Sequence, residues 1–222
     1  MEILPWDRAT SDREWRAWLA TTERFGLLTA NNCDPAAAPI VVPTHFTLAG
    51  DDIWLHLSRS NPAWPHLEAA AEVRLALTGD HAYVPSYWRA APDTPVTDGV
   101  PTSYYTSVQF VCHPAVVDDP DAKAGILRAQ LADLQPEGGH AEVTADGPPH
   151  ARMLPGIRGL VLTVLRVEAK FKYDDEKPVG HRSRVSERLD ERNQRLDRGA
   201  ARQQRRRRDL LGDWRERPEG TT

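Results

Sequence analysis

Five aromatic rings are concentrated in two short segments of this chain, residues 82–88 and residues 100–105. They are Tyr83, Tyr87, Trp88, Tyr104 and Tyr105. We expect both segments to be extended and to face each other across an intervening loop rich in Pro, Asp and Gly. Strands that bracket an irregular loop commonly hold a flat ligand, because the strands fix the ring faces while the loop adapts. A conjugated cofactor is therefore one interpretation, and aromatic cross-strand pairs at a sheet edge are the alternative.

Length and composition indicate one globular domain with an appendage. The chain has 222 residues, 40% of them hydrophobic, and no apolar run long enough to cross a membrane. Its first residues are acidic where a secretory signal would be basic, so we expect a cytoplasmic protein. Cys33 and Cys112 are expected to be reduced, structural thiols.

The charge is distributed unevenly along the chain. Residues 180–222 contain thirteen Arg against eight Asp and Glu, so this tail carries +5 and the preceding residues carry −9. A basic tail is typical of proteins that bind nucleic acid. However, Arg and acidic residues alternate from Arg182 to Asp197, which is typical of a solvated helix. We therefore predict a domain at 1–179 and a charged helical extension at 180–222, with nucleic acid an improbable partner.

The hydrophobic pattern predicts a mixture of helices and strands. Ser11 and Glu14 form a predicted capping box that begins a helix to about Thr22. A further helix is expected from Asn61 and Pro62. The remaining helix is expected at 121–134, a polar loop at 137–155, and strands at 25–29, 39–48, 53–58, 73–78, 104–113 and 159–172.

Four motifs occur in the order, and at roughly the spacing, of a known family. They are residues 56–64 (His-Leu-Ser-Arg-Ser-Asn-Pro-Ala-Trp), 80–83 (Asp-His-Ala-Tyr), 100–102 (Val-Pro-Thr) and 166–172 (Arg-Val-Glu-Ala-Lys-Phe-Lys). From about Ile40 to about Leu189 the chain resembles PaiB-type members of the flavin-binding split-barrel family. The resemblance implies an α+β fold: a six-stranded, mostly antiparallel split barrel with flanking helices, to which this chain adds its Arg-rich tail. It also implies a homodimer that holds its cofactor at the subunit interface.

The chain departs from the flavin-binding pattern at several positions. Ser103, Tyr104 and Tyr105 stand where PaiB-like members usually carry Trp-Asn-Tyr, and Gln109 replaces a His. His66 is gained beside the motif at 56–64, and an imidazole there suits haem iron. These departures are similar to those of the haem-dependent piperazate synthases of nonribosomal peptide pathways. That resemblance implies cyclisation of L-N5-hydroxyornithine, a small amino-acid substrate, to L-piperazic acid. The alternatives are an FMN-binding PaiB-like oxidoreductase and a transcriptional regulator.

The resemblance also implies a role for each candidate residue in binding haem b, or FMN in the alternative. His66 would be the iron ligand, with His113 the second choice, although a satisfied surface or core histidine is the simpler interpretation of either. Tyr104 or Tyr105 would be catalytic. His140, His150 and His181 are expected to be exposed. The expected cofactor-binding residues are His56, Ser58, Arg59, Ser60, Lys170 and Lys172, although the two lysines could equally be solvated.

Overall fold

The computed structural model describes residues 1–91 and 93–212, and these residues form two compact units. The sheet unit consists of Glu23–Leu77 and Gln109–Glu168. The terminal unit consists of the described residues of Met1–Thr22, Thr78–Val108 and 169–212. Three long strands contribute residues to both units.

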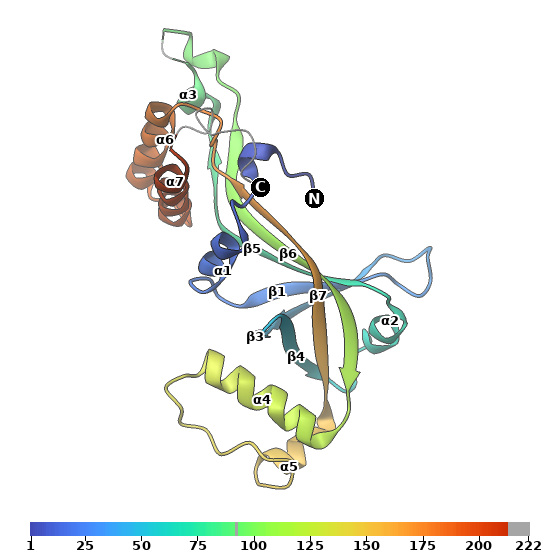
Figure 1. Ribbon diagram of the computed structural model, residues 1–222. Helices are drawn as coiled ribbons and strands as arrows, with labels where there is room; N and C mark the ends of the chain where they lie inside the picture. The colour runs from blue at the N-terminus through green and yellow to red at the C-terminus, as the bar shows by residue number, and fades with distance from the viewer. Residues whose placement is uncertain (92, 213–222) are drawn as a thin grey trace. The chain divides into compact units, whose positions relative to one another are not determined.

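The sheet unit contains a seven-stranded sheet with the order β2-β1-β5-β6-β7-β4-β3 (Figure 1). The recorded pairs of β1 with β2 and β5, and of β4 with β3 and β7, are antiparallel. The fold class is therefore α+β with a split-barrel-like sheet, as predicted, with seven strands in place of six. The strands are β1 (Phe25–Ala30), β2 (Ile40–His45), β3 (Thr47–Ala49), β4 (Asp52–Ser58), β5 (Val73–Val84), β6 (Thr102–Val117) and β7 (Ile157–Lys172).

Alternation along β1 decides which face of the sheet is buried. Leu28 is buried, whereas Phe25 and Leu27 are about half exposed. The register places Leu27 opposite Pro43 of β2, and Pro43 is exposed as well. Because successive side chains of a strand point to opposite faces, one face of this hairpin joins the core and the other stays uncovered.

Helix α4 (Pro120–Leu134) packs against β3 and β4. Asp119 caps its first turn by accepting a hydrogen bond from the backbone N–H of Ala122 at 2.8 Å. Near its other end, Asp133 accepts hydrogen bonds from Arg24 and from the Thr47 hydroxyl. The predicted helix at 121–134 is thus confirmed and is fixed at both ends. The sheet unit also contains α2 (Trp64–Ala69), α5 (His150–Met153) and the 3-10 helix η3 (Leu154–Gly156).

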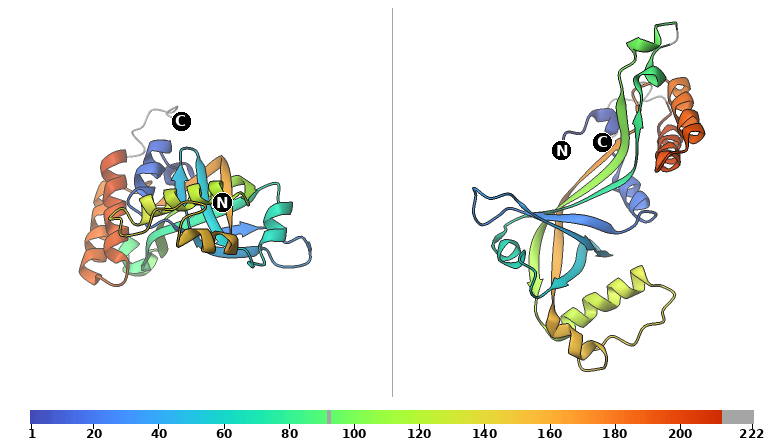
Figure 2. Two further views of the ribbon diagram at one scale, coloured as in Figure 1. Left: turned by 90° about the horizontal axis from the view of Figure 1, so that it is seen from below. Right: turned by 180° about the vertical axis from the view of Figure 1, so that it is seen from behind.

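The terminal unit contains α6 (Val179–Arg192) and α7 (Asp197–Leu211), which lie side by side in both views of Figure 2. Gly199 of α7 permits close packing, because a Cβ there would lie 1.8 Å from Asp80 Oδ2. The remaining elements of this unit are η1 (Pro5–Asp7), α1 (Asp12–Leu19), α3 (Ser86–Arg89) and η2 (Val96–Asp98). Residues 86–89 are therefore helical, which corrects the prediction that 82–88 is extended throughout. No helix among residues 1–91 and 93–212 combines the length and apolarity that a bilayer crossing needs.

A buried ionic network joins distant parts of the terminal unit. Arg207 of α7 is fully buried, and its guanidinium donates to Glu14 at 2.8 and 2.9 Å and to Asp175 at 2.8 Å. It also donates to the carbonyl oxygens of Trp6 and Arg8. Burial by itself would raise the pKa of Glu14, but Arg207 and a backbone N–H lower it below its usual value. Arg207 therefore connects α7 to the N-terminal segment, to α1 and to the turn after β7.

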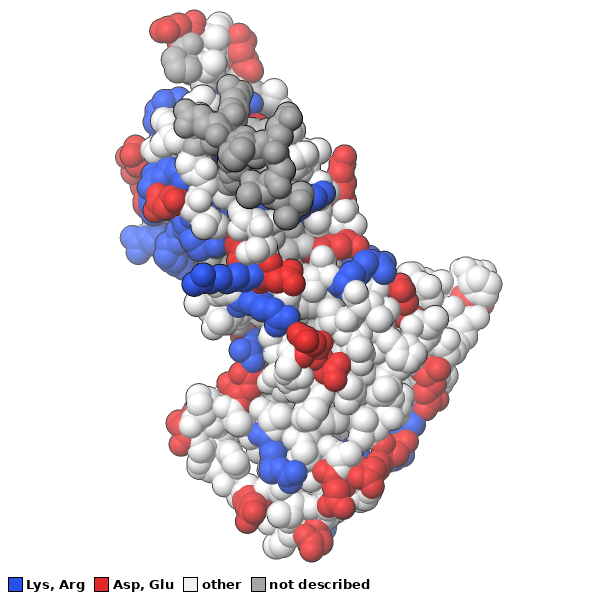
Figure 3. Space-filling model, in the orientation of Figure 1, with Lys and Arg blue, Asp and Glu red and all other residues white. Residues whose placement is uncertain are grey.

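This network corrects two expectations from the sequence. Glu14 does not form a capping box with Ser11, whose side chain makes no cap; Glu14 instead accepts from Thr10 and pairs with Arg207. The tail is not a solvated helix throughout, because Arg182 and Arg207 are fully buried. Figure 3 shows acidic side chains beside the basic ones over the C-terminal helices. In the unbroken Arg block, each arginine contacts a carboxylate: Arg205 with Asp190, Arg206 and Arg207 with Glu14, and Arg208 with Asp209.

Replacing Arg207 by Leu should destabilise the protein by about 3–5 kcal/mol, because two buried carboxylates lose three hydrogen bonds from a buried cation and keep only the longer contacts to Arg206 and Arg182. Urea unfolding followed by circular dichroism measures this loss. Arg202→Leu on the same helix is the matched control. The Arg202 side chain is 68% exposed and pairs with Asp80 at 3.5 Å, so its replacement should lower the free energy of unfolding by less than about 1 kcal/mol. Equal effects of the two substitutions would contradict the structural role of Arg207.

Asp7 should make the protein less stable as the pH rises. Burial raises the pKa of Asp7 from 3.8 to about 6, against the opposing charge of Lys170. Between these values the folded chain binds more protons than the unfolded chain. Rising pH therefore lowers the free energy of unfolding by up to about 3 kcal/mol. The free energy of unfolding of the wild type, minus that of Asp7→Asn, should therefore fall between pH 4 and pH 7. A constant difference would show that Asp7 has no raised pKa.

Candidate cofactor site

The turn after β4 carries three of the predicted cofactor-binding residues. The Ser58 and Ser60 hydroxyls lie 2.9 Å apart, and the Ser58 carbonyl accepts a hydrogen bond from Trp64 Nε1 at 2.8 Å. The Asn61 carboxamide accepts from the backbone N–H of Ala63, so Asn61 forms an Asx turn. Helix α2 consequently begins at Trp64, later than predicted.

Arg59, the predicted anion anchor, already has partners in the sheet unit. Its Nε donates to the Pro155 carbonyl at 2.8 Å, and its Nη2 donates to Asp118 at 3.0 Å. Hydrogen bonds from Arg158, and then from Arg59, lower the pKa of Asp118, which therefore stays ionised. Since the Arg59 side chain is 48% exposed, an anionic ligand could exchange with Asp118, but Arg59 is not a free cation.

His66 lies on α2 and lines a pocket of about 430 Å³ together with Asn31, Asn32, Cys33 and Glu72. Its Nδ1 accepts a hydrogen bond from the backbone N–H of Cys33 at 3.0 Å. In a neutral imidazole the proton then sits on Nε2, which has no partner among the described residues. A histidine that binds iron offers a lone pair and usually donates its other ring N–H. His66 is therefore accessible, but in this arrangement it has the wrong tautomer for coordination through Nε2.

The two candidate tyrosines have different environments in the terminal unit. Tyr104 is fully buried, and its hydroxyl donates to Asp174 at 3.1 Å. Burial, and then the negative charge of Asp174, raise the pKa of this phenol well above its usual value. Tyr105 is partly exposed, and its ring lies 5.9 Å from Lys170 Nζ and 6.0 Å from Lys172 Nζ. The Tyr104 hydroxyl is therefore already bonded to Asp174, whereas the Tyr105 hydroxyl is not.

Lys170 is also engaged within the terminal unit. Its ammonium group donates to the Glu2 carbonyl at 2.9 Å and lies 3.6 Å from Asp7. Lys170 is 8% exposed, whereas Lys172 is partly exposed. Lys172 is consequently the better placed of the two to meet an anionic ligand.

Asp174 is a residue that the sequence analysis missed. It accepts two hydrogen bonds from Arg89, at 2.9 Å each, one from Tyr104, and a 3.3 Å contact from His181. Burial by itself would raise the pKa of Asp174, but hydrogen bonds from His181 and Arg89 hold it below the usual value. The expectation that His181 is exposed is therefore wrong, because this ring is only 9% exposed. The positive φ of Asp174, 56°, was not visible in the sequence.

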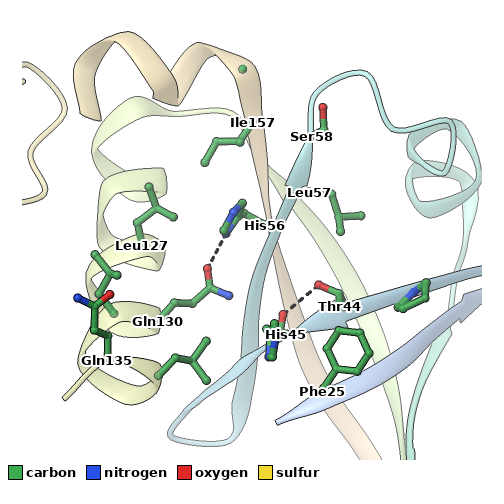
Figure 4. A pocket seen from close by; sticks show the side chains of 14 residues that line it. Phe25, Thr44, His45, His56, Leu57, Ser58, Leu127, Gln130, Gln135 and Ile157 are labelled. Atoms are coloured by element: carbon green, nitrogen blue, oxygen red, sulfur yellow. Dashed lines mark hydrogen bonds between the residues drawn. The ribbon is translucent and has the colours of Figure 1, made fainter. Parts of the chain in front are cut away.

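The sheet unit also contains a pocket of about 690 Å³ between α4 and strands β1, β2 and β4 (Figure 4). His56, a predicted cofactor-binding residue, points from β4 toward α4 and contacts Gln130. Ser58 lies at the edge of the same pocket. Gln130 was not identified from the sequence, where it appears only as one polar residue in an amphipathic helix.

The predicted site residues therefore fall into two groups. The sheet unit holds His56, Ser58, Arg59, Ser60 and His66, with His56 and His66 lining different pockets. The terminal unit holds Tyr104, Tyr105, Lys170 and Lys172. Among the described residues, no three His, Cys, Asp or Glu side chains are grouped as metal ligands.

Solved structures with a similar fold include three bacterial proteins. The flavocytochrome Anf3 from Azotobacter vinelandii is 21% identical, with 74% of this chain and 76% of that chain covered and a TM-score of 0.54. An FAD and heme binding protein from Mycobacterium smegmatis is 22% identical, with coverage of 74% and 72% and a TM-score of 0.56. The conserved hypothetical protein Rv2991 from Mycobacterium tuberculosis is 16% identical, with coverage of 77% and 90% and a TM-score of 0.54. At these identities the likeness shows a shared fold.

A search of curated proteins found no match. A family model described as "Putative FMN-binding domain" matches residues 3–166, which is most of the chain. This match spans the Ser58–Asn61 turn, His66, and the pocket between α4 and the sheet. The chain therefore belongs to this family of FMN-binding domains.

Proposed function

We propose that this protein binds haem b through His66 and cyclises L-N5-hydroxyornithine to L-piperazic acid. The observation that carries the proposal is an accessible imidazole on α2, immediately after the Ser58–Asn61 turn, in a chain of an FMN-binding family. Two proteins with a similar fold are a flavocytochrome and an FAD and heme binding protein, which supports haem as a ligand for this fold.

The residues present fit a haem in part. Arg59, Ser58 and Ser60 could hold a propionate if Arg59 exchanges Asp118 for the ligand. His66 fits only after the Cys33 N–H turns away from Nδ1, which lets the ring proton move to Nδ1 and frees the Nε2 lone pair. Cys33 and the residues after it are exposed, so this backbone can rearrange without opening the core.

The proposed reaction is redox-neutral and releases water. A bond forms between the α-amino nitrogen and N5, the N5–O bond breaks, and the hydroxyl leaves as water with a proton from the amine. Haem iron, when bound, would supply a Lewis acid that polarises the hydroxylamine. The protein would fold the substrate so that its two nitrogens meet, and a tyrosine would donate a hydrogen bond to the leaving hydroxyl. We assign that donor to Tyr105, because the Tyr104 hydroxyl is already bonded to Asp174.

We further propose that the protein is a homodimer with the cofactor at its interface. The supporting observation is the uncovered face of the β1–β2 hairpin, where Phe25, Leu27 and Val41 are each about half exposed. Apolar surface on neighbouring strands is typical of a protein contact. The domain boundary predicted near residue 179 also remains a proposal.

A second candidate is an FMN-binding oxidoreductase, which the matched family favours. In that case Arg59, Ser58 and Ser60 would hold the FMN phosphate, and His66 would remain hydrogen-bonded to the Cys33 N–H. Absorption spectra distinguish the two cofactors, because haem has a Soret band and flavin does not.

His66→Ala should abolish or strongly shift the Soret band of haem-loaded protein, because the substitution removes the proposed ligand. Circular dichroism should show an intact fold, since His66 lies on the wall of an open pocket. The control is His140→Ala in an exposed loop, which should leave the spectrum unchanged. An unchanged spectrum for His66→Ala would exclude His66, and His56 and His113 would then be tested.

Removing the Cys33 N–H tests the role of His66 in a second way. Cys33→Pro removes the donor that competes for His66, and Cys33 does not have the positive φ that proline cannot adopt. It should tighten haem binding about 2- to 10-fold relative to Cys33→Ala, which keeps the N–H. Equal affinities would mean that this hydrogen bond does not oppose coordination.

Haem-loaded protein incubated with L-N5-hydroxyornithine should yield a product lighter by one water, detected by mass analysis, without consuming NAD(P)H or oxygen. Tyr105→Phe should raise the barrier by roughly 2.7–4 kcal/mol if its hydroxyl stabilises the leaving group. Tyr104→Phe should lower mainly the stability, because buried Asp174 then loses the hydrogen bond that it accepts from the Tyr104 hydroxyl. If neither ferrous nor ferric protein forms the product, the oxidoreductase becomes the better proposal.

A further inference from the structure

The pocket between α4 and the sheet differs in chemistry from the turn that would hold an anionic cofactor group. We call it the α4 pocket. Its volume of about 690 Å³ is within the range typical of small-molecule sites. Figure 4 shows Leu127 projecting into it from α4, and Phe25 of β1 and Leu57 of β4 also line it, although the Leu57 side chain points away from α4. The walls are thus apolar and are supplied by regular secondary structure.

None of the described residues that line the α4 pocket is Asp, Glu, Lys or Arg. Charged side chains next to the lining residues are engaged elsewhere: Asp133 with Arg24, Arg59 and Arg158 with Asp118, and Arg128 with the Val143 carbonyl. An ionised ligand would leave water without gaining a counter-charge from the pocket lining, which is costly. The α4 pocket therefore favours a neutral ligand over a phosphate or a carboxylate.

Two polar side chains of the α4 pocket, His56 and Gln130, can orient a bound ligand by hydrogen bonding. His56 Nδ1 lies 2.6 Å from Gln130 Oε1, and because a carbonyl oxygen can only accept, Nδ1 carries the proton. His56 Nε2 is therefore an acceptor, and it has no partner among the described residues. Gln130 is only 6% exposed, and its amide nitrogen is likewise without a partner there. Three other polar side chains of the lining are used locally: Thr44 donates to the His45 carbonyl, Gln135 donates to that of Gly138, and the Ser58 hydroxyl lies 2.9 Å from that of Ser60. The His45 ring packs edge-on against Phe25.

We propose that the α4 pocket binds a neutral aromatic molecule through a hydroxyl group. The hydroxyl donates to His56 Nε2 and accepts from the Gln130 amide, while the ring packs against Phe25 and the leucines of α4. Gln130 acts as a positioning residue, because its carbonyl holds His56 in the accepting tautomer. The proposed iron ligand is not part of this site, since His66 lines a different pocket, whereas Ser58 lies at the edge of the α4 pocket.

Three biphenyl probes and the full chain, without added haem or flavin, test this proposal by calorimetry. 4-Phenylphenol should bind once per chain. 4-Methoxybiphenyl has no donor and leaves His56 Nε2 unsatisfied, so it should bind about 5- to 100-fold more weakly. Biphenyl-4-carboxylate should not bind measurably. Equal binding of the phenol and the ether, or preferential binding of the carboxylate, would overturn the proposal.

Variants locate the binding site. His56→Phe should remove the preference for the phenol over the ether, whereas His140→Phe, in an exposed loop, should keep it. Leu131→Trp, which fills the pocket from α4, should prevent binding of every probe. If the wild type binds no probe, the proposal is overturned. If Leu131→Trp then also converts a dimer to a monomer in light scattering, the pocket's occupant is a second copy of this chain.

Discussion

Burial of the Arg207 guanidinium is the constraint on which the terminal unit depends. A buried cation is stable only when its donors meet acceptors, and Arg207 finds them in Glu14, Asp175 and two backbone carbonyls. These partners come from segments nearly 200 residues apart in the chain. The same requirement explains why Glu14 leaves its expected cap. It also makes the C-terminal helices part of this unit's core, so the α7 sequence contributes to stability as well as to surface charge.

Two imidazoles in the sheet unit are held in opposite tautomers by their neighbours. His56 donates through Nδ1 to Gln130, whereas His66 accepts through Nδ1 from the Cys33 N–H. The first leaves a free lone pair in an apolar pocket, and the second leaves a free N–H in a more polar one. Each ring therefore has a different chemistry, although both are histidines within one short segment.

The residues proposed to hold the cofactor are already hydrogen-bonded within the protein. Arg59 and Lys170 already have acidic or carbonyl partners, and His66 has its backbone donor. Ligand binding at these residues is consequently an exchange of partners, and its free energy is the difference between two sets of hydrogen bonds. This favours ligands whose charge is concentrated, because they can replace Asp118 at Arg59.

Most strands and helices of the sheet unit, and the family, could be predicted from the sequence. Alternation along 53–58 predicted β4, and the helix at 121–134 was located to within one residue, because both patterns depend on neighbours in the chain. The single strand predicted at 39–48 is instead divided into β2, which pairs with β1, and β3, which pairs with β4. The motif at 56–64 likewise pointed to a cofactor-binding family. The burial of Arg207, the hydrogen bond from Tyr104 to Asp174 and the different tautomers of His56 and His66 became visible only in the folded chain. Charge state, burial and hydrogen-bond role depend on partners distant in sequence, and local spacing cannot show which partners the fold brings within reach.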